Sequence, residues 1–131
     1  MRNSDLPGRI VVVDDDPTVA DVVGRYLVRD GHTVECVHDG HEALRRIAEQ
    51  QPDLVVLDLM LPGIDGLEVC RRLRERPTLN HVRIVAMTGF PSSENIERIM
   101  AAGADACLSK PLDSERLLEE LGLGVSDSES G

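Results

Sequence analysis

The stretch DLVVLDLMLPGIDG, residues 53–66, gives the strongest indication of the fold of this chain. Four aliphatic residues, 54–57, lead up to Asp58, and three more apolar residues, 59–61, follow it. A continuous apolar run of this length is typical of a strand that is buried on both faces of a parallel sheet. Burial of one carboxylate in such surroundings is unfavourable unless other groups compensate its charge. The stretch therefore indicates a parallel sheet, and it marks Asp58 as a candidate functional residue.

Strand-like and helix-like segments alternate along the rest of the chain. The strand-like segments are residues 9–13, 33–37, 53–58, 82–88 and 104–109. The segments with apolar residues at helical spacing are residues 17–31, 39–51, 65–77, 92–103 and 113–121. Five βα units of this kind predict a doubly wound α/β fold, a (βα)5 three-layer sandwich around a five-stranded parallel sheet. We expect one domain, residues 8–121, with disordered tails at 1–7 and 122–131, where the residues are small and polar.

The composition argues against some classes of binding partner and indicates the cellular compartment. The 131 residues carry a formal net charge of −10, which argues against nucleic acid or an anionic membrane as a ligand because both attract cationic surfaces. The apolar runs fall far short of the roughly 20 residues of a membrane span, and the first residues lack the apolar core of a secretory signal. The three cysteines show no metal-binding or paired spacing, so we predict reduced thiols in a cytoplasmic protein.

Four arginines form a basic run on the third predicted helix. They are Arg71, Arg72, Arg74 and Arg76. Charges grouped on a helix in this way usually form a solvent-exposed face. We therefore predict a solvated face, with contact to a partner protein as the alternative.

Polar groups follow four of the five predicted strands. In an open α/β sheet, ligands bind outside the carboxyl ends of the strands, so the residues at those ends are the candidate site. They are Asp14, Asp15 and Asp16 after the first strand, Asp58 at the end of the third, Thr88 at the end of the fourth and Lys110 after the fifth. The second strand ends on no notable polar group, as expected for a strand at the sheet edge. Asp16 either caps the following helix or joins the site through a water molecule.

Carboxylates gathered at one point repel one another unless cations intervene. Lys110 supplies one positive charge, and a hard divalent ion such as Mg²⁺ would supply two more. Mg²⁺ takes few protein carboxylates, keeps several waters and bridges to phosphate oxygens. A softer metal does not fit this cluster, because it contains no cysteine or histidine. A carboxylate beside Mg²⁺ and a lysine can attack phosphorus and become an aspartyl phosphate. We therefore predict Asp58 as the nucleophile, with the Thr88 hydroxyl donating a hydrogen bond to a transferring oxygen.

Four motifs in this order resemble the receiver domain of bacterial two-component response regulators, the CheY-like family. The motifs are VVDDD at 12–16, VVLDLMLPGIDG at 55–66, MTG at 87–89 and SKP at 109–111. The resemblance covers residues 8–121. It implies a flavodoxin-like sheet with strand order 2-1-3-4-5.

The resemblance also implies a role for each matched residue. Asp58 matches the phosphoacceptor. Asp14 and Asp15 match the acidic pair that holds Mg²⁺, with Asp58 and the main-chain carbonyl of Met60 completing the protein ligands.

The implied switch has one departure from the family pattern. Thr88 matches the hydroxyl that turns toward the phosphoryl group, and Lys110 matches the lysine that contacts a phosphoryl oxygen. Three residues before that lysine the family usually has an aromatic residue that swings inward, but this chain has Cys107. A thiol is too small to fill the same space, so we expect the output face to switch differently or weakly.

The expected partners follow from the same resemblance. The phosphoryl donor would be a phosphohistidine on a sensor histidine kinase or a histidine phosphotransfer protein. Phosphorylation would shift the population toward an active arrangement that binds an unidentified downstream protein. The chain would then be a signalling switch, either a monomer or a weak dimer, with no output domain. It would not be an enzyme, beyond catalysing its own phosphorylation and dephosphorylation.

Two other functions are compatible with parts of the sequence. A degenerate receiver would act only as a constitutive interaction scaffold, an alternative that Cys107 keeps open. The segment VVVDDDPT, residues 11–18, also resembles the opening motif of haloacid-dehalogenase-like phosphatases, in which Asp14 would be the nucleophile. That family needs a further acidic pair late in the chain, and the sequence after Lys110 has no such pair at a strand end; Asp58 would also be left without a role.

Overall fold

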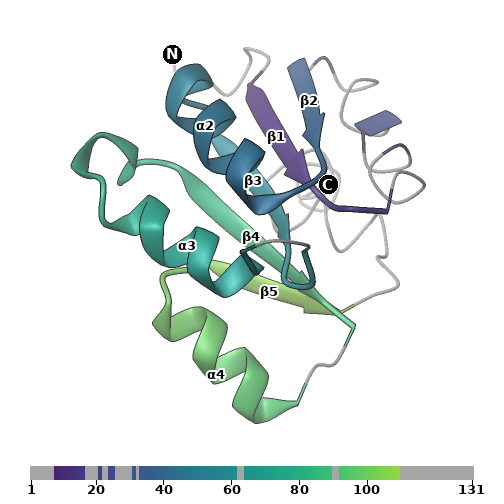
Figure 1. Cartoon of the computed structure of the whole chain (residues 1–131), viewed down its shortest axis with the longest axis vertical. Helices are drawn as coiled ribbons and strands as arrows, with labels where there is room; N and C mark the ends of the chain where they lie inside the picture. The colour runs from purple at the N-terminus through teal and green to yellow at the C-terminus, as the bar shows by residue number, and fades with distance from the viewer. Residues whose placement is uncertain are drawn as a thin grey trace, which may run out of the picture.

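Five parallel strands form one sheet in the computed structural model, which describes residues 8–16, 21, 24–25, 31, 33–61, 64–89 and 92–109. The strands are β1 (Arg9–Val13), β2 (Thr33–Val37), β3 (Leu54–Asp58), β4 (Arg83–Thr88) and β5 (Ala106–Ser109). Their spatial order is β2-β1-β3-β4-β5, and every neighbouring pair is parallel (Figure 1). The predicted doubly wound α/β sheet and its 2-1-3-4-5 order are confirmed.

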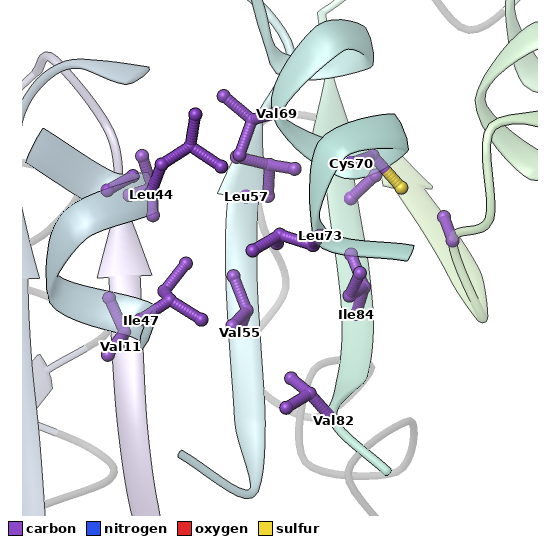
Figure 2. Close-up of a cluster of buried hydrophobic side chains, with 14 of the residues drawn as sticks. Val11, Leu44, Ile47, Val55, Leu57, Val69, Cys70, Leu73, Val82 and Ile84 are labelled. Atoms are coloured by element: carbon purple, nitrogen blue, oxygen red, sulfur yellow. The ribbon is translucent and has the colours of Figure 1, made fainter. Parts of the chain in front are cut away.

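Three helices cover one face of this sheet. They are α2 (Gly40–Gln50), α3 (Gly66–Arg74) and α4 (Ser93–Ala101), which lie to the left of the strands and below them in Figure 1. Ile47 of α2 and Leu73 of α3 belong to the same buried cluster as Val55 of β3 (Figure 2). Every residue of β3 is buried, which is what the uninterrupted apolar run of that segment predicted.

The opposite face of the sheet is buried as well. A second cluster uses the alternate residues of the same strands: Ile10, Val12, Leu54, Val56, Val85, Met87 and Leu108. Asp21, Gly24 and Arg25 of the first predicted helix are helical. A Cβ atom built on Gly24 would lie 3.8 Å from Val34 of β2, so the chain at Gly24 lies against the second face. Because both faces are covered, the three-layer arrangement is confirmed.

Side-chain caps begin the three helices of the first face. The caps are Asp39, Asp65 and Ser92, and each accepts a hydrogen bond from the backbone N–H three residues later, at 2.8, 3.0 and 3.2 Å respectively. Such a cap satisfies one of the N–H groups that have no partner inside a helix, and it stabilises the helix by about 1 kcal/mol. These caps set where each helix starts relative to the strand end before it.

The third helix is shorter than predicted. The sequence predicted a helix over residues 65–77, whereas α3 ends at Arg74 and a separate 3₁₀ turn, η2 (Pro77–Leu79), follows. Arg76 is extended, with φ −99° and ψ 114°, because a residue that precedes proline is excluded from the helical region. Pro77 then begins the new turn, where its missing N–H costs nothing.

The prediction that four arginines form a solvated face on the third helix is wrong for Arg74, and Arg76 lies beyond the end of α3. Arg71 and Arg72 are exposed and form ion pairs with Glu68 on the same helix. The Arg74 side chain is only 21% exposed, and its guanidinium points back into the fold. It donates hydrogen bonds to the carbonyls of Gly103 and Val82 at 2.8 and 2.7 Å.

Several predicted features lie outside the described residues. They are the helix at 113–121, Lys110, most of the helix at 17–31, and the two tails. Within the ranges that the structure describes, no helix is long and apolar enough to cross a membrane.

Candidate functional site

Three polar side chains are buried at the carboxyl ends of adjacent central strands. Asp14 directly follows β1, Asp58 is the last residue of β3 and Thr88 is the last residue of β4. Their exposed fractions are 0%, 2% and 3%, although almost every other buried side chain described is apolar. Asp15 is exposed beside them. The parallel register brings these strand ends to the same edge of the sheet, as the sequence predicted.

The three carboxylates form a set of hard oxygen ligands. Asp14, Asp15 and Asp58 each offer an oxygen, and these oxygens all lie within 4.8 Å of one another. Two carboxylates at this separation repel by roughly 3 kcal/mol at an effective dielectric constant of about 20. A divalent cation removes this repulsion, and an all-oxygen set with few carboxylates and room for water suits Mg²⁺. The arrangement therefore fits the metal that the sequence predicted.

The backbone of Asp14 is held by the end of β2. Its N–H donates to the carbonyl of Val37 at 3.1 Å, and its own carbonyl lies 3.0 Å from Nδ1 of His38. The N–H of Asp16 donates to Oδ1 of Asp14 at 2.8 Å, which turns the chain sharply after β1. The sequence reasoning assigned no role to His38; the only available signal was its position directly after the second predicted strand.

Asp58 is oriented by the loop that follows it. The N–H of Met60 donates to Oδ1 of Asp58 at 3.0 Å, and the N–H of Leu59 continues the pairing with β4 by donating to the carbonyl of Met87 at 3.0 Å. A Cβ atom on Gly66 would lie only 2.6 Å from the Asp58 carbonyl, so only glycine lets α3 begin this close to the strand end. The Met60 side chain is 60% exposed and points away from the core.

An open cleft of about 650 Å³ leads away from the carboxylates toward α4. Its walls are Asp15, Leu59, Met60, Leu61, Asp65, Leu67, Thr88, Asn95 and Arg98. A phosphorylated side chain of another protein could therefore reach the strand ends from solvent. Asp15 and Thr88 lie at the same cleft, so one ligand can approach both.

The remaining predicted site residues have different outcomes. Cys107 lies on β5, is half-buried and packs against the larger core cluster. Burial raises the pKa of its thiol, so the group is neutral at physiological pH and behaves as a small core side chain. Lys110 falls outside the described residues.

Comparison with known proteins identifies the family. The family model for the response regulator receiver domain matches residues 10–122. The chain is 46% identical over 113 residues to the response regulator MprA of Mycobacterium ulcerans, an alignment that covers 86% of this chain and 48% of the relative. It is 45% identical over 116 residues to MprA of Mycolicibacterium vanbaalenii, covering 88% and 49%. The chain therefore spans about half the length of the curated relatives that it matches.

Solved structures share the fold closely. The BeF3-activated N-terminal receiver domain of Klebsiella pneumoniae RstA superposes with a TM-score of 0.80 at 36% identity, covering 87% of this chain and 95% of that one. The chemotaxis response regulator CheY4 of Vibrio cholerae gives a TM-score of 0.84 at 28% identity, covering 88% and 97%. With these strand-end carboxylates, this sheet order and this family match, the chain belongs to the response regulator receiver domains.

Proposed function

We propose that Asp58 accepts a phosphoryl group from a phosphohistidine of a partner protein. One oxygen of the Asp58 carboxylate attacks phosphorus, the P–N bond to the imidazole breaks, and an acyl phosphate forms. The Met60 N–H donates to Oδ1 of Asp58 at 3.0 Å and so holds the orientation of the attacking group. Thr88, at the end of the neighbouring strand, supplies a hydroxyl donor for an oxygen of the transferred group.

Receiver domains bind Mg²⁺ at an acidic pocket, and this chain has an aspartate cluster that could hold it. In our proposal Asp14, Asp15, Asp58 and the main-chain carbonyl of Met60 are the protein ligands. The ion would neutralise charge on the oxygens of the transferring phosphoryl group. Lys110 is proposed as the second cation for the same oxygens, on the basis of the SKP motif.

The observation that carries this proposal is the convergence of three carboxylates within 4.8 Å, two of them buried, beside a buried threonine and an open cleft. Two buried aspartates at this separation repel each other, and a divalent cation at the phosphorylation site would offset that repulsion.

Receiver domains are signalling switches that interact with histidine kinases and downstream targets. For this chain we propose a sensor histidine kinase or a histidine phosphotransfer protein as the donor. The downstream target is proposed to bind the face that responds to Thr88. Because Cys107 replaces the usual aromatic residue, we expect the two states to differ less at β5 than in receivers that carry the aromatic.

The test is the intact mass of the chain after incubation with acetyl phosphate and Mg²⁺. We expect addition of one phosphoryl group, loss of that addition in Asp58→Asn, and loss on chelation of Mg²⁺. Asp53→Asn is the matched control, because Asp53 lies just before the other end of β3, away from the site, and its side chain accepts a hydrogen bond from the backbone N–H of Arg9 at 3.0 Å.

Other outcomes would contradict the proposal in recognisable ways. An addition that survives Asp58→Asn and disappears in Asp14→Asn would favour the phosphatase-like chemistry at Asp14. No addition, with acetyl phosphate or with a phosphohistidine donor, would leave the chain as an interaction scaffold.

A further inference from the structure

We propose that His38 is a positioning residue for the metal site, acting through the backbone of Asp14. The inference rests on the proposed function, since it concerns how this chain holds its magnesium ligands. Its basis is the 3.0 Å contact between Nδ1 of His38 and the main-chain carbonyl of Asp14.

The direction of this hydrogen bond follows from the chemistry of the two groups. A carbonyl oxygen only accepts, so Nδ1 of His38 must carry the proton and donate it. The contact joins residues 24 positions apart in the chain. It therefore ties the turn after β1 to the end of β2, the strand at the edge of the sheet.

Together with its neighbour, His38 fixes both backbone groups of Asp14. The carbonyl of Val37 accepts from the Asp14 N–H at 3.1 Å, and His38 donates to the Asp14 carbonyl at 3.0 Å. The peptide groups on both sides of Asp14 are thus held by consecutive residues of one strand end. With these contacts, rotation of the backbone at Asp14 would break at least one hydrogen bond.

His38 is itself anchored, because it lies between a strand and a helix cap. The residue after it, Asp39, accepts from the N–H of Glu42 at 2.8 Å and from the N–H of Ala43 at 3.0 Å, and so begins α2. The backbone of His38 therefore has little freedom, although its side chain is exposed. A ring held in this way can restrain the acidic turn at small entropic cost.

The restraint has a consequence for metal affinity. The carboxylates of Asp14, Asp15 and Asp58 repel one another before a cation binds, and a loose turn would relieve that repulsion by moving Asp14 and Asp15 apart. Ion binding would then have to reverse the movement. Groups that orient metal ligands typically change affinity by 10- to 100-fold, and for a contact through the main chain we expect about tenfold.

The experiment compares Mg²⁺ dissociation constants of the full chain by titration calorimetry. His38→Leu removes the donor and should weaken Mg²⁺ binding about tenfold. His38→Asn places an amide N–H where Nδ1 lies and should stay within about threefold of the parent. His38→Gln carries its amide one methylene further out and should behave like His38→Leu. His41→Leu is the matched control, since His41 is an exposed histidine on α2, and it should leave the constant unchanged.

Thermal unfolding of each variant without metal separates positioning from general stability. We expect melting temperatures within a few degrees of the parent for all of them, because the His38 side chain is exposed. Binding by His38→Leu and His38→Gln at parental affinity would overturn the inference, as would equal weakening in His38→Asn and His38→Leu. If the parent chain does not bind Mg²⁺, both the proposed function and the inference fail. If the parent binds Mg²⁺ and His38→Leu and His38→Gln bind it equally well, only the inference fails.

Discussion

Arg74 is predicted to be the most important charged residue for the stability of the described fold. It ends α3, and its guanidinium reaches three main-chain carbonyls: Gly103 at 2.8 Å, Val82 at 2.7 Å and Leu79 at 3.4 Å. It also donates to Oδ2 of Asp105 at 2.8 Å. One side chain thus joins the end of α3, the turn before β4 and the loop between α4 and β5.

The cost of removing the guanidinium can be estimated from these contacts. A hydrogen bond to a charged group contributes about 1.5–3 kcal/mol, and the lower figure applies here because the Arg74 side chain is 21% exposed. Two short bonds to carbonyls then contribute about 3 kcal/mol, and the pair with Asp105, which is 39% exposed, adds about 0.5 kcal/mol. We expect Arg74→Met, which keeps most of the aliphatic stem, to lower the free energy of unfolding by roughly 3.5 kcal/mol.

Urea unfolding followed by far-ultraviolet circular dichroism measures this change, since the chain has no tryptophan for fluorescence. Arg74→Lys keeps the positive charge but not the several N–H donors of the guanidinium, so its free energy of unfolding should fall by roughly half as much as that of Arg74→Met. Arg71→Met is the control on the same helix: Arg71 is 57% exposed and pairs only with Glu68 among the described residues, so its loss should cost at most about 0.5 kcal/mol. Equal destabilisation by Arg74→Met and Arg71→Met would show that the contacts of Arg74 with the main-chain carbonyls do not stabilise the fold.

Three further predictions concern stability. Gly103→Ala should cost about 2 kcal/mol or more in urea unfolding, because Gly103 has φ +117° and a Cβ atom there would lie 2.4 Å from Cγ of Arg74; a change under 0.5 kcal/mol would contradict this. Asp39→Ala should lower the free energy of unfolding by about 1 kcal/mol, because the Glu42 N–H loses its cap. Asp39→Ser keeps a capping oxygen and should lose only a small part of that stability. Burial raises the pKa of Cys70 to about 11, so the folded state keeps a proton that the unfolded state releases near pH 8.5. This part of the stability is complete below pH 8.5 and declines as pH rises toward 11, by up to about 1.4 kcal/mol per pH unit, so Cys70→Ala should show a shallower decline; parallel pH profiles would exclude the effect.

The predicted topology was right because its signals are local. A run of aliphatic residues such as 54–57 forms a strand wherever it is buried, and apolar residues at helical spacing select the alternate elements. The βα alternation then leaves few possible sheets, and all of them place the ends of β1, β3 and β4 on one edge. Proximity of Asp14, Asp15 and Asp58 therefore follows from the sequence.

The boundary errors also have local causes that the periodicity concealed. The predicted helix ran to residue 77, although its last apolar residue at helical spacing is Leu73, and the restriction that Pro77 places on Arg76 ended α3 earlier. The segment predicted to begin the fifth strand at residue 104 instead starts pairing at Ala106, after Gly103 turns the chain with a positive φ. In both cases one backbone constraint prevailed over the pattern of side chains.

The sheet, the strand ends and the meeting of the carboxylates could be predicted from the sequence alone, since each depends on neighbours along the chain and on the rule that parallel strands end at the same edge. The contacts of Arg74 and His38 depend on how distant segments pack. Arg74 donates to Gly103, 29 positions away, and His38 contacts Asp14, 24 positions away. Their partners are main-chain carbonyls, which every residue carries, so no side-chain pattern could identify them; only the packing of α3 on the sheet and of β2 beside β1 selects those carbonyls.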